Sequence, residues 1–407
     1  MIALKEGKQK SVLNHHPWLF TGALDNIERP SEARIDKVCD SAGHFLAWGY
    51  YDGRSHIPVH IMSWNESEQP DEDWWAAKVK ESILRRRSFF EQGKSAQTTA
   101  FRIIHGEADF LGGLTCDVYG TVVRVIISSR LAYMFKDAAI GAIEALLHPS
   151  LAILNTDPAF CSAEGLPKEI EYYRLGEKFT PQEKLDPIRI RESGLLYELV
   201  PGTGQKSGFY CDQRENRNII EQYCTGKTVM DGCSYSGAFT LHALRAGAAS
   251  VDAFDSSEDA LHMLLANVNM NEEAGTIPEL SRAKVTVTKC DIFEQIRQIP
   301  DDKYDVIILD PPKLASTKSA ADKAKRAYKD LNRIAMEKIR NGGILVSCSC
   351  SGAITHEDFK TVLGWAAKDA CASAQILHSL SQGPDHPILV SFPESEYLKV
   401  FVMRIIR

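Results

Sequence analysis

The sequence predicts an α/β fold, with a doubly wound parallel sheet in the C-terminal half preceded by a small β-rich domain and an α+β domain. Three observations predict this class. Short strand-like stretches broken by turn residues fill about the first 70 residues, and mixed helix and strand patterns follow to about residue 185. From about residue 195 onward, strands alternate with helices at the spacing of βαβ units. The length of 407 residues fits two or three domains.

The first domain is expected over residues 1–70. Its strand-like stretches lie at residues 37–39, 44–50 and 57–62 and are separated by turn-forming residues. The segment 66–73 is acidic and contains a proline, so we expect it to be a linker.

The middle domain is expected over residues 74–185. Its patterns mix helix and strand, which is typical of an α+β domain. The segment 176–191 contains one glycine, two prolines and several charged residues, and we place the second domain boundary there. The expected helices lie at residues 74–92 and near 137–147, and the expected strands at 101–105 and 122–128.

The C-terminal domain is expected over residues 190–407. The run at 304–309 is largely apolar, as in a strand buried on both faces. Leu261, Leu264, Leu265 and Val268 have helical spacing, which predicts a helix after the second strand. The expected strands lie at residues 227–231, 250–255, 285–288, 304–309 and 344–347, with two late strands near 376 and at 398–403.

Composition favours a cytoplasmic protein that does not span a membrane. No stretch approaches the roughly 18 apolar residues of a membrane span, and the N-terminus has mixed charge rather than the apolar region of a signal peptide. Ten cysteines in so long a chain are expected to be reduced thiols. Cys348 and Cys350 have no second pair at zinc spacing, so we expect no metal.

Two clusters of basic residues are candidates for RNA contact, although the net charge of −7 argues against a protein that coats nucleic acid. One cluster contains Arg85 and Arg86, and the other contains Lys313 and Lys325. We expect these four side chains to bind RNA. The alternative, a solvated helix face, has equal support.

Four clusters follow predicted strands, where ligands bind in open α/β sheets. The loop 231–237 contains two glycines that permit a tight turn and close approach of backbone to ligand. Asp255 can accept hydrogen bonds from both hydroxyls of a ribose or, alternatively, cap the next helix. Asp291 is placed to meet a purine ring, but the sequence supports this no better than a neutral role. Asp310 precedes two prolines that fix its angle to the cleft, unless the segment is a plain turn.

Together the four clusters favour an adenosine-containing cofactor. The glycine-rich loop lacks the full Gly-x-Gly-x-x-Gly dinucleotide pattern, so it is a weak signal alone. The chain also lacks the Gly-x-x-x-x-Gly-Lys-Ser/Thr sequence of P-loop NTPases, which disfavours that class.

The order of these clusters resembles the motifs of class I S-adenosylmethionine-dependent RNA methyltransferases, since Asp-Pro-Pro-Lys at 310–313 is followed by Ser-Cys-Ser-Gly at 349–352. The closer resemblance is to the ribosomal large-subunit methyltransferase I family, bacterial enzymes that form 5-methylcytosine in 23S rRNA. It extends over essentially the whole chain. Further matching segments lie at residues 16–22, 206–214, 385–387 and 397–399.

The resemblance implies a PUA domain, a middle domain and a Rossmann-like methyltransferase domain, in that order. It implies S-adenosylmethionine as cofactor, with its methionine part near the loop 232–237, its ribose at Asp255 and its adenine beside Asp291. It also implies 23S rRNA as the partner, and a homodimer is one option for the assembly. The implied cofactor-binding residues are Lys206, Phe209, Gln213, Asp231, Gly232, Cys233, Ser234, Gly237, Asp255, Ser256, Asp291 and Asp310.

Methylation at C5 of cytosine needs a nucleophile, because C5 does not attack a methyl sulfonium unaided. A thiolate that adds to C6 makes C5 nucleophilic. The resemblance aligns this thiol with Cys350, whereas strand parity leaves Cys348 open, because the two residues share a face. Asp310 is the second expected catalytic residue, at the N3/N4 edge of the base. Many 5-methylcytosine enzymes have another cysteine where this chain has Lys313, so the acceptor of the C5 proton is unassigned.

Three other functions remain open at this stage. A guanine or adenine N-methyltransferase also uses an Asp-Pro-Pro sequence but needs no cysteine. An RNA-binding assembly factor would keep the fold without catalysis, which the presence of Asp255, Asp310 and Cys350 disfavours. A small-molecule methyltransferase would leave the two N-terminal domains without a purpose.

Overall fold

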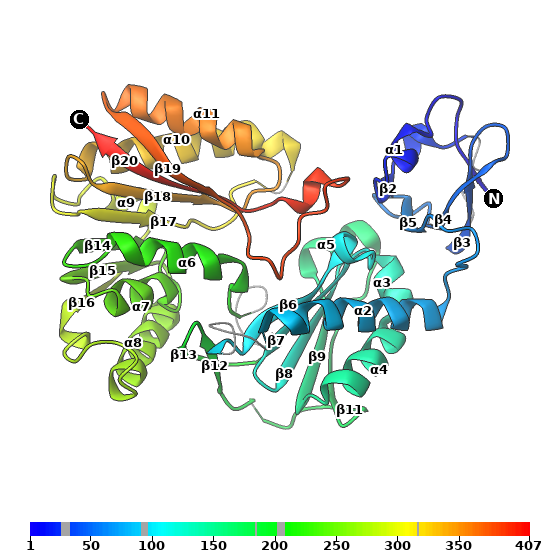
Figure 1. The fold of residues 1–407 in the computed structure, drawn as a ribbon, viewed down its shortest axis with the longest axis horizontal. Helices are drawn as coiled ribbons and strands as arrows, with labels where there is room; N and C mark the ends of the chain where they lie inside the picture. Colours follow the sequence, from blue (N-terminus) through cyan, green and yellow to red (C-terminus); the bar gives the residue numbers. More distant parts are fainter. Residues whose placement is uncertain (26–32, 91–96, 184, 202–207, 316) are drawn as a thin grey trace. The chain divides into compact units, whose positions relative to one another are not determined.

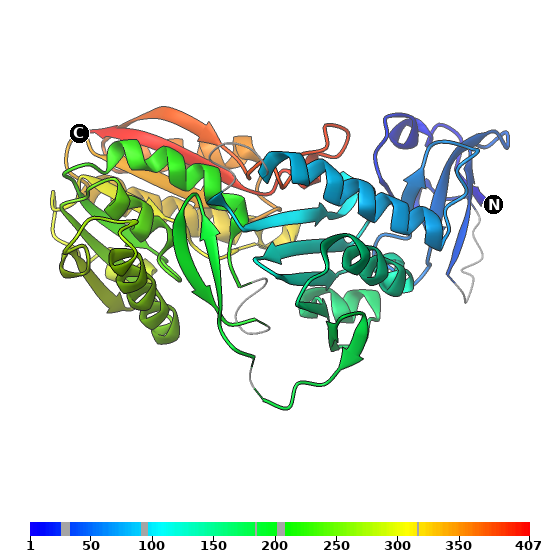
Figure 2. The same cartoon turned by 60° about the horizontal axis from the view of Figure 1, so that its bottom comes forward.

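The computed structural model describes residues 1–407 apart from 26–32, 91–96, 184, 202–207 and 316. The chain forms two compact units that alternate along the sequence, and Figures 1 and 2 show the elements of each. Unit 1 comprises Met1–Ile190, Leu199–Phe209 and Pro384–Ser395. Unit 2 comprises Arg191–Glu198, Tyr210–Gly383 and Glu396–Arg407.

Unit 1 begins with a five-stranded sheet around a small apolar core. Side chains such as Ile2, Val38 and Ile61 are buried there. A short helix, α1 (Lys10–Leu13), precedes the second strand. Across the sheet the strands are β1 (Ile2–Ala3), β3 (Arg34–Cys39), β4 (Phe45–Tyr51), β5 (Val59–Ser63) and β2 (Trp18–Leu19).

A six-stranded mixed sheet forms the rest of unit 1. Its core includes Trp75 and Val79 from the long helix α2 together with Ile103 and Val125 from the sheet. Across the sheet the strands are β11 (Glu177–Phe179), β10 (Ile170–Arg174), β9 (Leu151–Thr156), β8 (Val122–Ile127), β7 (Leu114–Tyr119) and β6 (Ala100–His105). The helices are α2 (Glu72–Phe90), α3 (Arg130–Met134), α4 (Lys136–Leu147) and α5 (Pro158–Glu164).

A two-stranded sheet of β12 (Ile188–Glu192) and β13 (Leu195–Leu199) comes next in the sequence, and a seven-stranded sheet forms the centre of unit 2. Five neighbouring strands of the larger sheet are parallel, and the last two pair antiparallel. Across the sheet they are β16 (Val285–Lys289), β15 (Ser250–Asp255), β14 (Thr228–Gly232), β17 (Val306–Leu309), β18 (Ile344–Ser349), β20 (Lys399–Ile406) and β19 (Ser373–Leu380).

Helices cover both faces of this sheet (Figure 1). Met230 of β14 packs into the core formed with the ninth, tenth and eleventh helices. Its neighbour Asp231 points to the other face, where Thr240 of the seventh helix contacts it. The helices are α6 (Arg214–Ile220), α7 (Ala238–Arg245), α8 (Glu258–Glu273), α9 (Ile292–Gln295), α10 (Ala321–Lys338) and α11 (His356–Asp369).

The predicted strands of the C-terminal half are confirmed, and the strand expected at 250–255 coincides with β15. The prediction of a parallel sheet is wrong at β20, which pairs antiparallel with both β18 and β19. A parallel pair needs a crossover, usually a helix, but the connection between β19 and β20 contains only the short 3₁₀ helix Pro393–Ser395.

In unit 1 the sequence pattern gave no signal for β7, β9, β10 and β11. All six residues of β9 are buried, so the strand has no alternation of polar and apolar residues that a sequence pattern could show. Its partner β8 was predicted, and the two strands pair in parallel.

Candidate active site

Neighbouring parallel strands of unit 2 end in the predicted acidic residues. β15, β14 and β17 are adjacent, and Gly232 at the end of β14 is paired with Phe254 and Leu309. Asp255 ends β15, and Asp310 directly follows β17. The amide of Asp310 donates to the carbonyl of Gly232 at 3.3 Å. These residues therefore meet at the sheet edge where open α/β proteins bind ligands.

The loop after β14 is a tight turn held by Asp255. Cys233, Tyr235 and Gly237 have φ angles of 67°, 48° and 83°. Oδ2 of Asp255 accepts a hydrogen bond from the amide of Tyr235 at 2.9 Å, and its Oδ1 accepts one from the amide of Ser257 at 2.8 Å. Carboxylate oxygens have further acceptor capacity, so Asp255 can still bind ligand hydroxyls.

Ser257, rather than Asp255, is the N-cap of α8. Its side chain accepts a hydrogen bond from the amide of Ala260. This excludes helix capping as the main role of Asp255. Ser256, a predicted cofactor contact, is exposed beside it.

The two glycines of the loop are required first by packing. A Cβ on Gly237 would lie 2.5 Å from Cγ of Leu264 in α8, so a larger residue would displace that helix. A Cβ on Gly232 would lie 3.1 Å from the carbonyl oxygen of Ile308. The expected tight turn is therefore present, and both glycines also let the loop pack closely on its neighbours.

Asp231 is a buried acid with one unsatisfied oxygen. Its Oδ2 accepts a hydrogen bond from the hydroxyl of Thr240 at 2.7 Å. Burial raises its pKa to about 6. Within the described residues, Oδ1 of Asp231 and the hydroxyls of Ser234 and Ser236 are buried without a hydrogen-bond partner. Buried polar atoms are almost always satisfied, so these three atoms fit the binding of a polar ligand.

Asp310 is positioned by an amide relay from α6. The amide nitrogen of Asn216 donates to Oε1 of Gln213 at 2.7 Å, and Nε2 of Gln213 donates to Oδ2 of Asp310 at 3.1 Å. Burial raises the pKa of Asp310 to about 7, and the negative charge of Asp212 adds to this shift. Gln213, predicted as a cofactor contact, thus also orients a predicted catalytic residue.

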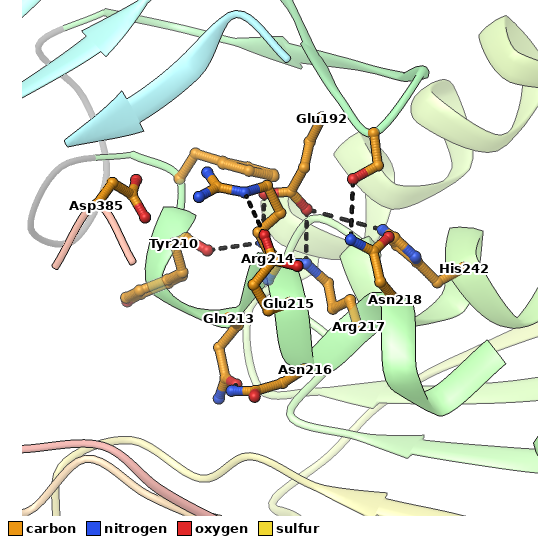
Figure 3. Close-up of polar contacts among 12 residues, drawn as sticks. Glu192, Tyr210, Gln213, Arg214, Glu215, Asn216, Arg217, Asn218, His242 and Asp385 are labelled. Carbon is orange, nitrogen blue, oxygen red and sulfur yellow. Dashed lines mark hydrogen bonds and ion pairs between the residues drawn. The ribbon is translucent and has the colours of Figure 1, made fainter. Parts of the chain in front are cut away.

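A buried ion pair anchors the relay (Figure 3). The guanidinium of Arg217 in α6 donates to both oxygens of Glu192, each at 2.7 Å, and to the carbonyl of Tyr210 at 2.7 Å. Burial raises the pKa of Glu192, but Arg217 and His242 lower it to below its ordinary value. No local sequence pattern indicates this ion pair, because its two partners are 25 positions apart. Asn216 follows Gln213 at helical spacing, a signal that was available.

The structure distinguishes the two candidate thiols. Cys348 lies inside β18 and is fully buried, and burial raises its pKa well above the ordinary value. β18 ends at Ser349, so Cys350 lies just beyond the strand and is only partly buried. A buried thiol with a raised pKa is a poor nucleophile, which favours Cys350.

Ser351 connects the thiol-bearing loop to the loop after Asp310. Its hydroxyl accepts hydrogen bonds from the amides of Leu314 and Ala315, both at 3.1 Å, and lies 3.1 Å from the hydroxyl of Tyr328. Its carbonyl accepts a hydrogen bond from Nζ of Lys399 at 2.8 Å. Neither Ser351 nor Lys399 is among the site residues predicted from the sequence.

Asp291 and the predicted RNA contacts of unit 2 are exposed or paired. Asp291 is exposed and caps α9, since Oδ1 accepts a hydrogen bond from the amide of Phe293 at 2.9 Å. Lys313 is exposed, and Nζ of Lys325 lies 2.6 Å from Oδ1 of Asp358. RNA contact by Lys325 would compete with this ion pair.

In unit 1 the prediction for Arg86 needs correction. Its side chain is 2% exposed, and two of its nitrogens lie 2.6 Å from the two oxygens of Asp109. Arg86 therefore serves the interior of unit 1 rather than an RNA surface. The run of three arginines at 85–87 predicts a basic face, but consecutive residues of a helix point in different directions, so they do not share one face. Arg85 is half exposed and also pairs with Asp109.

Phe209 and Lys206 are the remaining predicted cofactor contacts. Phe209 is buried in unit 1, where its carbonyl accepts a hydrogen bond from the hydroxyl of Tyr119 at 3.2 Å. Lys206 lies outside the described residues. Both assignments stay predictions.

Across the described part of the chain, no group of three or more His, Cys, Asp or Glu side chains has the arrangement of a metal site. None of the helices described is both long and apolar enough to cross a membrane. All ten cysteines are described, and none forms a disulfide.

Comparisons with known proteins match both parts of the chain. Residues 2–64 match the model of a PUA-like domain, and residues 103–401 match that of an S-adenosylmethionine-dependent methyltransferase. Two proteins named ribosomal RNA large subunit methyltransferase I are 35% and 34% identical to this chain. They come from Pseudoalteromonas translucida and Shewanella frigidimarina, respectively. Each alignment covers 99% of both chains.

Solved structures show the same fold. A protein crystallised with S-adenosylhomocysteine and assigned as a methyltransferase superposes with a TM-score of 0.81, with 21% identity over 99% of both chains. A Streptococcus mutans protein assigned to the same class gives a TM-score of 0.80, with 21% identity over 99% of this chain and 100% of the other. At this identity the likeness concerns the fold alone.

Proposed function

We propose a function for this chain from the family to which it belongs, the ribosomal RNA large subunit methyltransferase I family of S-adenosylmethionine-dependent methyltransferases. The chain is an S-adenosylmethionine-dependent methyltransferase, and the proposed reaction is methylation of C5 of a cytosine in large-subunit rRNA. The names of the relatives support the rRNA substrate. Such a substrate implies a cytoplasmic site of action.

The residues at the sheet edge fit the cofactor. When bound, S-adenosylmethionine supplies an electrophilic methyl group on a sulfonium. Asp255 would hold the ribose, since its carboxylate already fixes the loop and retains acceptor capacity. Asp231 and the hydroxyls of Ser234 and Ser236 offer buried oxygens for the remaining polar groups. The exposed Asp291 is the proposed contact for the adenine.

Cys350 is the proposed nucleophile. Its thiolate forms a bond to C6 of the cytosine, which makes C5 nucleophilic. The bound cofactor would supply its methyl group to C5 and leave as S-adenosylhomocysteine, and a base then removes the C5 proton. The electrons of that C–H bond restore the C5–C6 double bond as the C6–S bond breaks, which returns the thiolate. The partial exposure of Cys350 beyond the end of β18 is the observation that carries this proposal.

Asp310 is proposed to bind the N3/N4 edge of the cytosine. With a pKa of about 7, its carboxyl is partly protonated near neutral pH. The protonated form donates to N3 and accepts from the N4 amino group, which draws electrons from the ring and favours attack at C6. Gln213 and Asn216 keep this carboxyl in one orientation.

The experiment compares Cys350→Ala with Cys348→Ala on large-subunit rRNA. RNA containing 5-fluorocytosine should trap the wild type covalently, because fluorine at C5 cannot leave as a proton does. We expect Cys350→Ala to lose this adduct and to lose at least about 10³-fold of 5-methylcytosine formation, measured by mass spectrometry.

Cys348→Ala is the matched control and should keep both the adduct and the activity, because Cys348 is buried in the sheet. Full activity of Cys350→Ala, with the methyl group on a guanine or adenine nitrogen, would instead identify an N-methyltransferase that uses no covalent intermediate.

A further inference from the structure

Lys399 is a buried lysine next to the proposed nucleophile. It is the first residue of β20 and is paired with Ser349 of β18. Its side chain is buried, and Nζ donates hydrogen bonds to the carbonyls of Ser351 and Tyr397 at 2.8 and 2.9 Å. Lys399 thus contacts both sequence neighbours of Cys350: it pairs with Ser349 and binds the carbonyl of Ser351.

The contacts of Lys399 leave it a cation with unused capacity. An ammonium group has three N–H donors, and the two carbonyls accept only two of them. In the part of the chain that the structure describes, Lys399 forms no salt bridge with a carboxylate. Burying a lysine without such a partner costs folding free energy, which is typical of a residue with a functional role.

Lys399 is one of the ionisable groups near Cys350. Cys350 interacts electrostatically with Lys399 and also with Tyr210, Tyr328 and Cys348. Burial raises the pKa of both tyrosines and of Cys348, so these three groups are neutral near pH 7.

Lys399 keeps its charge at that pH. Burial lowers the pKa of Lys399 to about 8, a shift that Lys313 adds to and that Cys350 and Glu396 oppose. Lys399 is therefore mostly protonated at pH 7, where it can face a thiolate.

We propose that Lys399 is a positioning residue that stabilises the thiolate of Cys350 and holds its loop in place. This inference rests on the proposed function, in which Cys350 is the nucleophile. The thiol proton of Cys350 passes to solvent. The ammonium of Lys399, which binds the carbonyl of the next residue, Ser351, then stabilises the thiolate. An opposite charge nearby typically lowers a thiol pKa by about one to three units.

The experiment measures the alkylation rate of Cys350 by iodoacetamide from pH 6 to 10, with adducts located by mass spectrometry, in the full-length protein. Wild-type Cys350 should titrate at least about one unit below an ordinary thiol, whose pKa is about 8.5. Lys399→Met should raise this midpoint by about one unit or more, which cuts the thiolate fraction at pH 7 about ten-fold. Lys399→Arg keeps the charge and should restore most of the shift.

Cys371 is the internal control, because it is exposed and its alkylation rate should be the same in all three proteins. A wild-type midpoint at or above 8.5 for Cys350 would overturn the proposal without reference to any variant, so it stays testable even if Lys399→Met fails to fold. An unchanged midpoint in folded Lys399→Met would also overturn it and leave Lys399 a purely structural role.

The readout does not depend on RNA methylation. If Cys350→Ala keeps full activity while the alkylation results are as expected, the proposed function fails and the electrostatic role of Lys399 stands. If Cys350→Ala is inactive but Lys399→Met leaves the midpoint unchanged, the function stands and this inference fails.

Discussion

At the scale of single residues, the sheet edge buries two acids. Asp231 is the penultimate residue of β14 and Asp310 follows β17, and burial raises the pKa of each, to about 6 and about 7. Ordinary aspartates are fully ionised well below these values. The cluster therefore titrates in the physiological range, which is typical of functional sites.

Asp310→Asn should stabilise the protein at high pH while reducing methylation. The folded-state pKa of Asp310 lies above 3.8, so the folded protein binds this proton more tightly than the unfolded chain. Its stabilising contribution is complete at low pH and is lost as pH rises through about 4 to 7. Relative to wild type, the free energy of unfolding of Asp310→Asn should rise by about 1–3 kcal/mol between pH 5 and 8.

Urea unfolding at several pH values measures this difference. Asp259→Asn, which changes an exposed acid in the first turn of α8, is the control and should run parallel to wild type. If the free energy of unfolding had the same pH dependence in Asp310→Asn and wild type, the raised pKa of the Asp310 carboxyl would be contradicted.

Local sequence pattern points to the residues proposed to touch a ligand more readily than to those that support them. Asp255, Asp310 and Cys350 lie in short, ordered motifs after strands, so local pattern was sufficient. Arg217 and Lys399 reach the site only through partners distant in sequence, Glu192 and the loop of Ser351. No local pattern encodes such a contact.

At the scale of secondary-structure elements, α6 acts as the support of Asp310. Its amide relay to Asp310 depends on the buried pair between Arg217 and Glu192. Helix and strand patterns predicted most elements of unit 2, because alternating buried strands and amphipathic helices leave a clear periodicity. They failed for β9, which is buried throughout.

Arg217→Met should destabilise the protein by about 3–5 kcal/mol, because it leaves the carboxylate of Glu192 buried without its main partner. The double variant Arg217→Met/Glu192→Leu should recover most of that loss, since it removes both charges. Urea unfolding of the three proteins provides the measurement.

The control is Lys289→Met, which breaks an exposed ion pair with Glu258 and should cost less than about 1 kcal/mol. If Arg217→Met costs no more than this control, the ion pair does not anchor α6 as described.

At the scale of the whole molecule, the two units share one chain that passes between them several times. The described residues proposed to hold the cofactor and the cytosine lie in unit 2, except Phe209, which lies in unit 1. Lys206 is outside the described residues. The sequence predicted successive domains, but it could not predict that the segment Pro384–Ser395 returns to unit 1, because Arg102 and Asp385 meet only through folding.

S-adenosylhomocysteine should therefore protect amides unevenly. Hydrogen exchange should slow about ten-fold or more at saturating ligand in residues 232–237 and 255–257, because the ligand binds only the folded loop. Residues 34–63, in the five-stranded sheet, provide the comparison and should exchange at the same rate with and without ligand. Equal slowing in both regions would mean that the ligand acts on the whole fold rather than at the sheet edge.

The position of β20 has a consequence for synthesis on the ribosome. β20 is synthesised after both of its neighbours, yet it occupies an interior place in the sheet, between β18 and β19, and begins with Lys399. Until β20 leaves the exit tunnel, β18 and β19 both lack their shared neighbour and expose unpaired backbone. A nascent chain can thus assemble the acidic edge early, but it acquires its buried ammonium only when β20 pairs, so products truncated before β20 would be inactive and prone to aggregate.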